Sequence, residues 1–352
     1  MRKFEPDYRH IVNAAFNVEA ERLPLYEHII SYKKIEDITD TSFADLYHGD
    51  EKEVREFFRN YCKFFANYGY DCVPYEECIS LAMPGSGALG DPRIDPVIKT
   101  MEDCKKYPWD EITERFFLAR GKHFAALRQE LPAGMRAIGG VGNGVFECVQ
   151  TLVGFMNLCY IKEDDPELYQ LLFAKVSEAM LLTWQRFMRE YADVYGVLRF
   201  GDDLGFKSTT LLSADDVREY IIPGYRAVIE EVHSYRKPFL YHSCGQIFDV
   251  MDDIIDVGVN AKHSNEDQIG LFPEWVRRYG DRIGNFGGID TDAVCRLNKQ
   301  EMKEYIVDVL DQCKGHGGIA FGSGNSIPDY VPEEGYLNMI EIVREYRGDF
   351  RN

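Results

Sequence analysis

The feature that most restricts the fold is a regular alternation of short apolar runs with amphipathic helical patterns from about Gly196 onward. Strands that alternate with helices in this way form parallel sheets, because a parallel pair needs a long crossover connection. Five strand–helix units fit into about 150 residues, and their apolar runs are "GVLRFGDD", "PFLYHSCG", "VNAKHS", "RIGNFGGID" and "GIAFGSGNS". The helix that follows the first run is expected to begin at Ser213, a natural N-cap residue.

Three further candidate strands lie upstream, in "RLPLYEH", "YDCVPYE" and "MRAIGGVGN". Longer helical segments separate them, for example over 50–70 and 165–196. Eight strands favour an α/β fold of the (β/α)₈ TIM-barrel type, with extra N-terminal helices. No Gly/Ser/Pro-rich linker or shift in composition divides the chain, so we expect residues 1–352 to form a single domain.

Composition excludes several classes of partner. The net charge of −19 argues against nucleic acid, because there is no excess of Lys or Arg to neutralise phosphates. The first residues lack the apolar core of a signal peptide, and no run approaches the roughly 18 apolar residues of a membrane helix. The nine cysteines are odd in number and irregularly spaced, which favours a reduced, cytoplasmic protein.

In a barrel of this type, chemistry belongs at the carboxyl ends of the strands. His242 and Cys244 lie two residues apart at one such end, so both side chains are expected on the same face. Their Cα atoms would be roughly 6.6 Å apart, close enough to share one ion. Imidazole and thiolate are ligands that zinc prefers. The alternative is a buried cysteine beside a hydrogen-bonded core histidine.

Asp202 and Asp203 end another predicted strand. Adjacent strand residues point to opposite faces, so at most one of them points toward the site, and the other is expected to cap a loop or helix. An aspartate facing the site would position a substrate or take part in proton transfer.

Three other residues are candidates for binding. Glu147 follows the glycine-rich "GGVGNGVFE", where the backbone can approach a ligand closely, although no nucleotide-binding fingerprint is present. Glu27 and His28 end the first predicted strand and would be able to complete a metal site. A lone histidine in this position is more often structural.

Several motifs, in this order, resemble the uroporphyrinogen decarboxylase superfamily: "GDDLG", "SADDVREYIIPGYRAVIEEVHSYRKPFLYHSCGQI", "GDRIGNFGGIDTD" and "GSGNSIPDYVPEEGYLNMIE". The resemblance is strongest from Gly196 to Tyr346 and weaker upstream. It implies a single (β/α)₈ barrel. The superfamily also contains corrinoid-dependent methyltransferases, which move methyl groups between a small molecule and a cobalamin protein.

Two departures distinguish this chain within the superfamily. The decarboxylases carry an Arg-rich "RQAGR" motif near the first strand, whereas the matching region here reads "LPLYEHIISYKKIEDI" and has no arginine. The zinc methyltransferases use a His-x-Cys pair and a later cysteine after the last strand. His242 and Cys244 match the pair, but the third position falls on Ser323, a poor zinc ligand. Either Glu27, His28, Glu147 or a substrate carboxylate completes the site, or the metal has been lost.

The resemblance implies a methyltransferase that takes a methyl group from a small methylated substrate. Zinc on His242 and Cys244 would act as a Lewis acid, and Asp202 or Asp203 would position the substrate or supply a proton. The acceptor would be a corrinoid on a separate partner protein, because nothing here resembles a cobalamin-binding domain. The substrate would be bound by Glu27, His28, Glu147 and Ser323. A cofactor-free decarboxylase of the same fold and a non-catalytic binding barrel are the alternatives.

Overall fold

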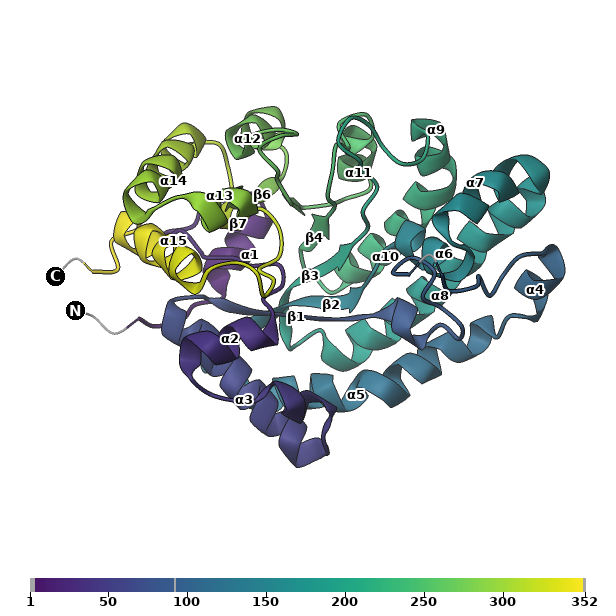
Figure 1. Ribbon diagram of the computed structural model, residues 1–352, viewed down its shortest axis with the longest axis horizontal. Coiled ribbons are helices and arrows are strands. Elements are labelled where there is room, and N and C mark those ends of the chain that lie inside the picture. The colour runs from purple at the N-terminus through teal and green to yellow at the C-terminus, as the bar shows by residue number, and fades with distance from the viewer. Residues whose placement is uncertain (1–3, 92, 351–352) are drawn as a thin grey trace.

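The computed structural model describes residues 4–91 and 93–350 and is built on one curled parallel sheet (Figure 1). Its strands follow one another around the sheet in chain order, as the alternating pattern predicted. The strands are β1 (Cys72–Cys78), β2 (Arg136–Gly142), β3 (Tyr195–Gly201), β4 (Phe239–His242), β5 (Ala261–His263), β6 (Gly284–Ile289) and β7 (Ile319–Ser323). The α/β class is therefore confirmed, with seven of the eight expected strands in place.

The expectation of a complete eight-stranded barrel is not met. The first predicted strand makes only an isolated bridge, between Leu25 and Phe321 of β7, and a second bridge follows at Ile30. Tyr26 donates its N–H to Phe321 O, and Phe321 donates to Pro24 O, both at 2.9 Å. Among the described residues no ladder joins this segment to β1. Pro24 has no N–H to donate, which limits the ladder that this segment can form.

The interior of the curled sheet is sealed at the amino ends of its strands. Helix α1 (Arg9–Ala15) packs there against one inward-facing residue from each strand and against Tyr26. The contact is close: a Cβ on Gly284 or on Gly318 would lie 2.1 Å from the carbonyl oxygen of Ala14. The carboxyl ends of the strands are left as the end where side chains can meet a ligand. We call this end the mouth.

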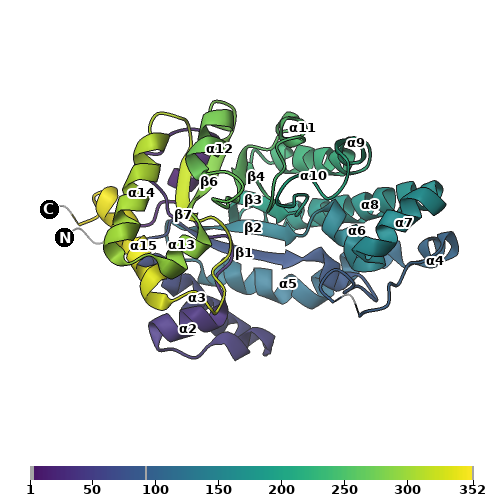
Figure 2. The same cartoon turned by 45° about the horizontal axis from the view of Figure 1, so that its top comes forward.

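The other helices cover the outer face of the sheet, with α3 beside β1, α8 beside β2, and α12 and α14 beside β6 (Figure 2). A large apolar core lies between the sheet and these helices. The longer helices are α3 (Glu51–Tyr68), α5 (Ile112–Glu130), α6 (Val145–Val153), α7 (Phe155–Asp164), α8 (Pro166–Tyr191), α10 (Ile222–Ser234), α14 (Lys299–Cys313) and α15 (Glu333–Tyr346). The shorter ones are α2 (Tyr32–Thr39), α4 (Met101–Lys106), α9 (Ala214–Asp216), α11 (Met251–Asp256), α12 (Phe272–Tyr279) and α13 (Thr291–Arg296).

Local sequence explains where several helices begin. Asp50 caps α3 and Asn298 caps α14, each in a reciprocal capping box with a glutamate three residues later. Ser213 caps α9 as predicted, by accepting from the Asp216 N–H. The single helix expected after Ser213 is interrupted, however, by a π-helical turn over Val217–Ile221 just before Pro223. Proline lacks an N–H, so the regular ladder cannot continue through it.

Two further findings bear on the expectations from composition. No helix in the described part of the chain is both long and apolar enough to span a bilayer. All nine cysteines are free thiols.

Candidate metal centre

The predicted His242–Cys244 pair meets at the mouth. His242 is the last residue of β4 and is buried, while Cys244 follows in the loop and is partly exposed. Nε2 of His242 lies 3.4 Å from Sγ of Cys244. The two potential ligand atoms therefore face one another at the end of the sheet opposite to helix α1.

A second histidine, which the sequence interpretation overlooked, determines how His242 presents its ring. His263 ends β5 directly beside His242, with which it is paired in register. Its Nε2 lies 3.0 Å from the carbonyl oxygen of Ser323, and its Nδ1 lies 2.8 Å from Nδ1 of His242. Burial lowers the pKa of His263 to about 3 and holds the pKa of His242 well below its usual range, so both rings are neutral.

The hydrogen bonds then fix the tautomer of both rings. A carbonyl oxygen can only accept, so His263 donates from Nε2 to Ser323 O and has a lone pair on Nδ1. His242 must donate from Nδ1 to that lone pair. Its Nε2 is left unprotonated, with its lone pair directed toward Cys244, which is the state that a metal ligand requires.

His28 supports the same ring from its other side. The rings of His28 and His242 are stacked, with centroids 3.8 Å apart and planes 4° from parallel. His28 is itself buried, and its Nδ1 lies 3.5 Å from the hydroxyl of Tyr26. The structure therefore places this predicted binding residue against the imidazole of His242.

The two aspartates after β3 have different surroundings. The Asp202 carboxylate is fully buried and accepts hydrogen bonds from the N–H groups of Phe146 and Glu147, at 2.9 and 2.8 Å, in the first turn of α6. It also accepts from the hydroxyl of Tyr225 at 2.6 Å. Burial raises the pKa of Asp202, and these three donors oppose the rise. Asp202 thus anchors α6 to β3, whereas Asp203 faces the metal candidates.

Asp203 approaches both members of the His–Cys pair. Its Oδ1 accepts a hydrogen bond from the backbone N–H of Cys244 at 2.8 Å and lies 3.7 Å from Nε2 of His242. One ligand atom each from Asp203, His242 and Cys244 lie within 4.8 Å of one another. Carboxylate oxygen, imidazole nitrogen and thiolate sulfur are all zinc ligands, so the chemistry of this donor set fits the metal that the resemblance implies.

The thiol of Cys244 has its own hydrogen-bond donors. Nδ2 of Asn325 lies 3.3 Å from Sγ, and Oγ of Ser264 lies 3.9 Å from it. Burial, with Asp203 nearby, raises the pKa of Cys244 to about 12, while the two donors oppose that rise. A divalent ion would supply the positive charge that a thiolate needs here.

Ser323, at the position where the resemblance expects a third ligand, is occupied elsewhere. Its Oγ lies 2.5 Å from Oε2 of Glu27 and 2.5 Å from the carbonyl oxygen of Asn325. The hydroxyl has one proton, which goes to the carbonyl oxygen, so Glu27 must itself donate to Ser323 as a neutral carboxylic acid. Burial raises the pKa of Glu27 to about 8, which agrees with a neutral carboxylic acid.

Glu147 lies apart from the pair. Its Oε2 accepts from the Asn143 amide at 2.8 Å in the first turn of α6. Burial and the neighbouring charges of Asp202 and Asp203 raise its pKa. In the described part of the chain neither Glu147 nor Glu27 belongs to a metal-binding cluster, whereas His28 forms a separate one with His242 and His263.

A buried ion pair forms the layer beneath the histidines. Arg199 of β3 is fully buried and donates from Nε to Glu76 of β1 at 2.7 Å. Its Nη1 donates to the Tyr26 hydroxyl at 2.7 Å and to the carbonyl oxygen of His28 at 3.1 Å. This cross-barrel contact positions His28, and no local motif in the sequence indicated it.

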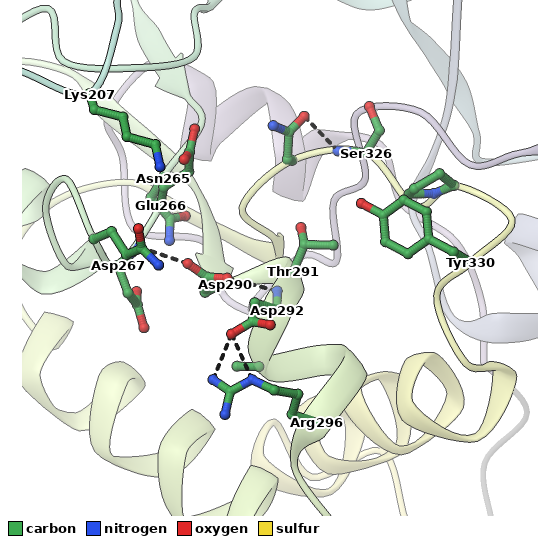
Figure 3. A pocket seen from close by; sticks show the side chains of 14 residues that line it. Lys207, Asn265, Glu266, Asp267, Asp290, Thr291, Asp292, Arg296, Ser326 and Tyr330 are labelled. Atoms are coloured by element: carbon green, nitrogen blue, oxygen red, sulfur yellow. Dashed lines mark hydrogen bonds and ion pairs between the residues drawn. The ribbon is translucent and has the colours of Figure 1, made fainter.

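A cavity of about 550 Å³ adjoins the metal candidates at the mouth. In Figure 3, Lys207, Asn265 and Glu266 face Ser326 and Tyr330 across it. Asn325, which contacts the Cys244 sulfur, also lines the cavity. Four acidic side chains line it against two basic ones, and these charged residues are Glu266, Asp267, Asp290, Asp292, Lys207 and Arg296.

Most of these acidic side chains already have partners. Asp290 caps α13 by accepting from the Asp292 N–H at 2.7 Å. Asp292 pairs with Arg296, and Asp267 accepts from the hydroxyl of Tyr305 at 2.8 Å.

Comparisons with known proteins agree with this architecture. The family model described as uroporphyrinogen decarboxylase (URO-D) matches residues 59–346. A methyltransferase from Methanosarcina mazei superimposes with a TM-score of 0.77 at 14% identity, over 97% of this chain and 99% of that one. A B12-independent methionine synthase from Shewanella sp. W3-18-1 gives 0.46 at 11% identity, over 64% and 66%. No curated protein matches the sequence. The seven-stranded curled sheet, its mouth and the extent of the family match show that this chain belongs to the uroporphyrinogen decarboxylase (URO-D) family.

Proposed function

We propose that this chain is a methyltransferase that moves a methyl group from a small methylated substrate to the corrinoid of a separate protein. The observation that carries the proposal is the pairing of His242 Nε2 with Cys244 Sγ, 3.4 Å apart at the mouth. The fold shared with a methyltransferase from Methanosarcina mazei supports it. In this proposal the chain is an enzyme that works with a bound zinc ion.

Zinc held by His242 and Cys244 would polarise the heteroatom that carries the methyl group, as a Lewis acid. The protein's own contribution begins with the hydrogen bond from His242 to His263, which keeps the Nε2 lone pair free. Asn325 donates to the Cys244 sulfur and so favours the thiolate.

The substrate would occupy the cavity beside Asn325. A volume of about 550 Å³ suits a small organic molecule. The excess of carboxylates over basic side chains favours a neutral or cationic methyl donor over an anionic one.

The corrinoid partner would approach over the mouth, because the other end of the sheet is closed by α1. The methyl group would leave its oxygen, nitrogen or sulfur atom without the bonding electron pair, which stays on that atom. The new carbon–cobalt bond is formed by the electron pair of Co(I), and the leaving heteroatom takes a proton from solvent or from an acidic group at the mouth.

A cofactor-free decarboxylase of the same fold is the second candidate, and it receives less support. A substrate with several carboxylates would meet the acidic lining of the cavity. Arg199, which is buried inside the sheet, is already paired with Glu76. A barrel that binds a ligand without turnover is the third candidate.

The proposal is tested by incubating the purified protein with Co(I) corrinoid and a panel of methyl ethers, methylamines and methyl thioethers. We expect formation of methyl-Co(III) with at least one class, followed by its visible spectrum. Transfer in the absence of this protein is the control. Carbon dioxide release from metal-free protein would instead favour the decarboxylase, and tight binding without product would favour the binding barrel.

Metal content is measured in parallel for the wild type, His242→Ala and Cys244→Ala. We expect about one zinc per chain in the wild type and loss of it in both variants, since a catalytic zinc has only three protein ligands. Less than about half a zinc per wild-type chain would end the Lewis-acid mechanism.

A further inference from the structure

We propose that Asp203 is the third protein ligand of the metal centre. The family resemblance expects this ligand at position 323, where the chain has a serine. This inference rests on the metal centre of the proposed function and goes beyond it by assigning the complete protein donor set. The assignment is Oδ1 of Asp203, Nε2 of His242 and Sγ of Cys244, with a fourth position open to the substrate.

The two distances from His242 Nε2 to the other ligand atoms suit a common tetrahedral centre, and all three residues offer ligand atoms within 4.8 Å of one another. Ordinary zinc–ligand bond lengths and a tetrahedral angle place a nitrogen and a sulfur ligand about 3.6 Å apart, and a nitrogen and an oxygen ligand about 3.3 Å apart. The observed separations are 3.4 Å from His242 Nε2 to Cys244 Sγ and 3.7 Å from His242 Nε2 to Asp203 Oδ1. Each differs from the ideal value by only a few tenths of an ångström.

Asp203 is also held in place for this role. The backbone N–H of Cys244 donates to Oδ1 at 2.8 Å, which occupies one of the two lone pairs of that oxygen. The second lone pair remains for a metal. The side chain is 43% exposed, so the centre would lie at the solvent side of the mouth, where a substrate can reach the fourth position.

Ser323 does not compete for the metal. Its Oγ is engaged at 2.5 Å with both Glu27 and the carbonyl oxygen of Asn325. These contacts hold the loop from which Asn325 donates to the Cys244 sulfur at 3.3 Å. The serine that departs from the family pattern therefore supports the thiolate through Asn325, while the carboxylate of Asp203 supplies the missing anionic ligand.

The cluster of three histidines is a poorer site. Two nitrogen ligands on one zinc are about 3.3 Å apart, whereas the Nδ1 atoms of His242 and His263 are 2.8 Å apart, a hydrogen-bond distance. His263 also donates its other nitrogen to Ser323 O. A metal bound at these Nδ1 atoms would have to break the hydrogen bond between the two rings.

Charge points to the same donor set. One carboxylate and one thiolate together neutralise the charge of a divalent cation, and the neutral imidazole of His242 adds no charge. A partly buried metal centre without net charge avoids the desolvation cost that a charged one would carry.

The decisive experiment measures zinc affinity of the full chain by competition with a chromogenic chelator. The Asp203→Asn variant keeps the oxygen that accepts from the Cys244 N–H but loses the negative charge. We expect its zinc affinity to fall by at least about 100-fold, which exceeds the loss typical when a residue that only supports a ligand is changed. Asp215→Asn is the matched control, because it removes the same charge from a side chain that is 94% exposed. Ser323→Ala should lower zinc affinity by about 10-fold, less than Asp203→Asn does, since its hydroxyl acts on the thiolate only through Asn325.

Cobalt(II) substitution gives a second readout that does not depend on activity. The Asp203→Asn protein, saturated with cobalt, should keep the sulfur-to-cobalt charge-transfer band of Cys244 while its ligand-field bands shift. If Asp203→Asn binds zinc within about threefold of the wild type, or if Ser323→Ala loses affinity as strongly, the assignment of Asp203 is wrong although the metal centre stands. If the wild type binds neither zinc nor cobalt, the proposed function fails together with this inference.

Discussion

Nδ1 of His242 lies 2.8 Å from Nδ1 of His263, and this contact directs the free Nε2 lone pair of His242 toward Cys244. His263 is able to accept the hydrogen bond because its own proton is committed to the carbonyl oxygen of Ser323. The chain of hydrogen bonds therefore runs from the loop after β7, through β5, to the ligand on β4. Without it, His242 would be free to protonate Nε2 instead.

We expect His263→Phe to weaken zinc binding by about 10–100-fold, because phenylalanine fills the site but cannot accept from His242. The measurement is chelator competition, with unfolding in urea to show that the variant is folded. His48→Phe, at an exposed histidine, should bind zinc as the wild type does. Unchanged affinity in His263→Phe would mean that His263 does not control the tautomer of His242.

The two neighbouring aspartates should separate stability from metal binding. Asp202→Ala leaves the N–H groups of Phe146 and Glu147 and the hydroxyl of Tyr225 without their buried acceptor. We expect the free energy of unfolding in urea to fall by about 3 kcal/mol or more. Asp203→Ala, at a side chain that is 43% exposed, should cost about 1 kcal/mol or less. Equal losses in the two variants would contradict the anchoring role of Asp202.

Glu27 should make stability depend on pH. Burial raises its pKa to about 8 in the folded protein, whereas an unfolded glutamate has a pKa of about 4.3. The folded state therefore binds more protons between these values, and its stability is highest below the unfolded pKa and decreases as pH rises toward 8. Glu27 can lower the free energy of unfolding by up to about 1.4 kcal/mol for each unit that the pH rises.

The matched variant is Glu27→Gln, which is uncharged at every pH and can still donate to Ser323. Urea unfolding of both proteins at several pH values between about 5 and 8 isolates the contribution of Glu27, because all other groups are common to both. The wild type should lose stability relative to Glu27→Gln as pH rises. A constant difference across this range would show that Glu27 is already ionised in the folded protein.

Uroporphyrinogen should be a poor ligand. Its carboxylates would face Glu266, Asp267, Asp290 and Asp292 at the cavity, and repulsion between them is strongest at low ionic strength. We expect no carbon dioxide release, and binding, followed by fluorescence of the oxidised porphyrin, that strengthens as salt is added. Tight binding that weakens with added salt would instead indicate a basic patch that recognises the carboxylates.

The local sequence was sufficient for the features that depend on short-range periodicity. The alternation of apolar runs and helices predicted all seven strands of the parallel sheet, because a strand and its crossover helix each have their own hydrophobic period. The spacing of His242 and Cys244 predicted that their side chains point the same way, because residues two apart on a strand share a face. Because adjacent strand residues point to opposite faces, the sequence also predicted that Asp202 and Asp203 would have different surroundings.

The tertiary structure decided which partner each of these groups received. Asp202 rather than Asp203 anchors α6 because the free N–H groups of that helix lie beside it, contributed by residues more than fifty positions upstream. Ser323 is paired with Glu27, from the opposite end of the chain, which no local pattern indicated. His263 lies beside His242 only through the register of β4 and β5. Hydrogen bonds act over about 3 Å of space whatever the separation along the chain, so only the folded sheet determines them.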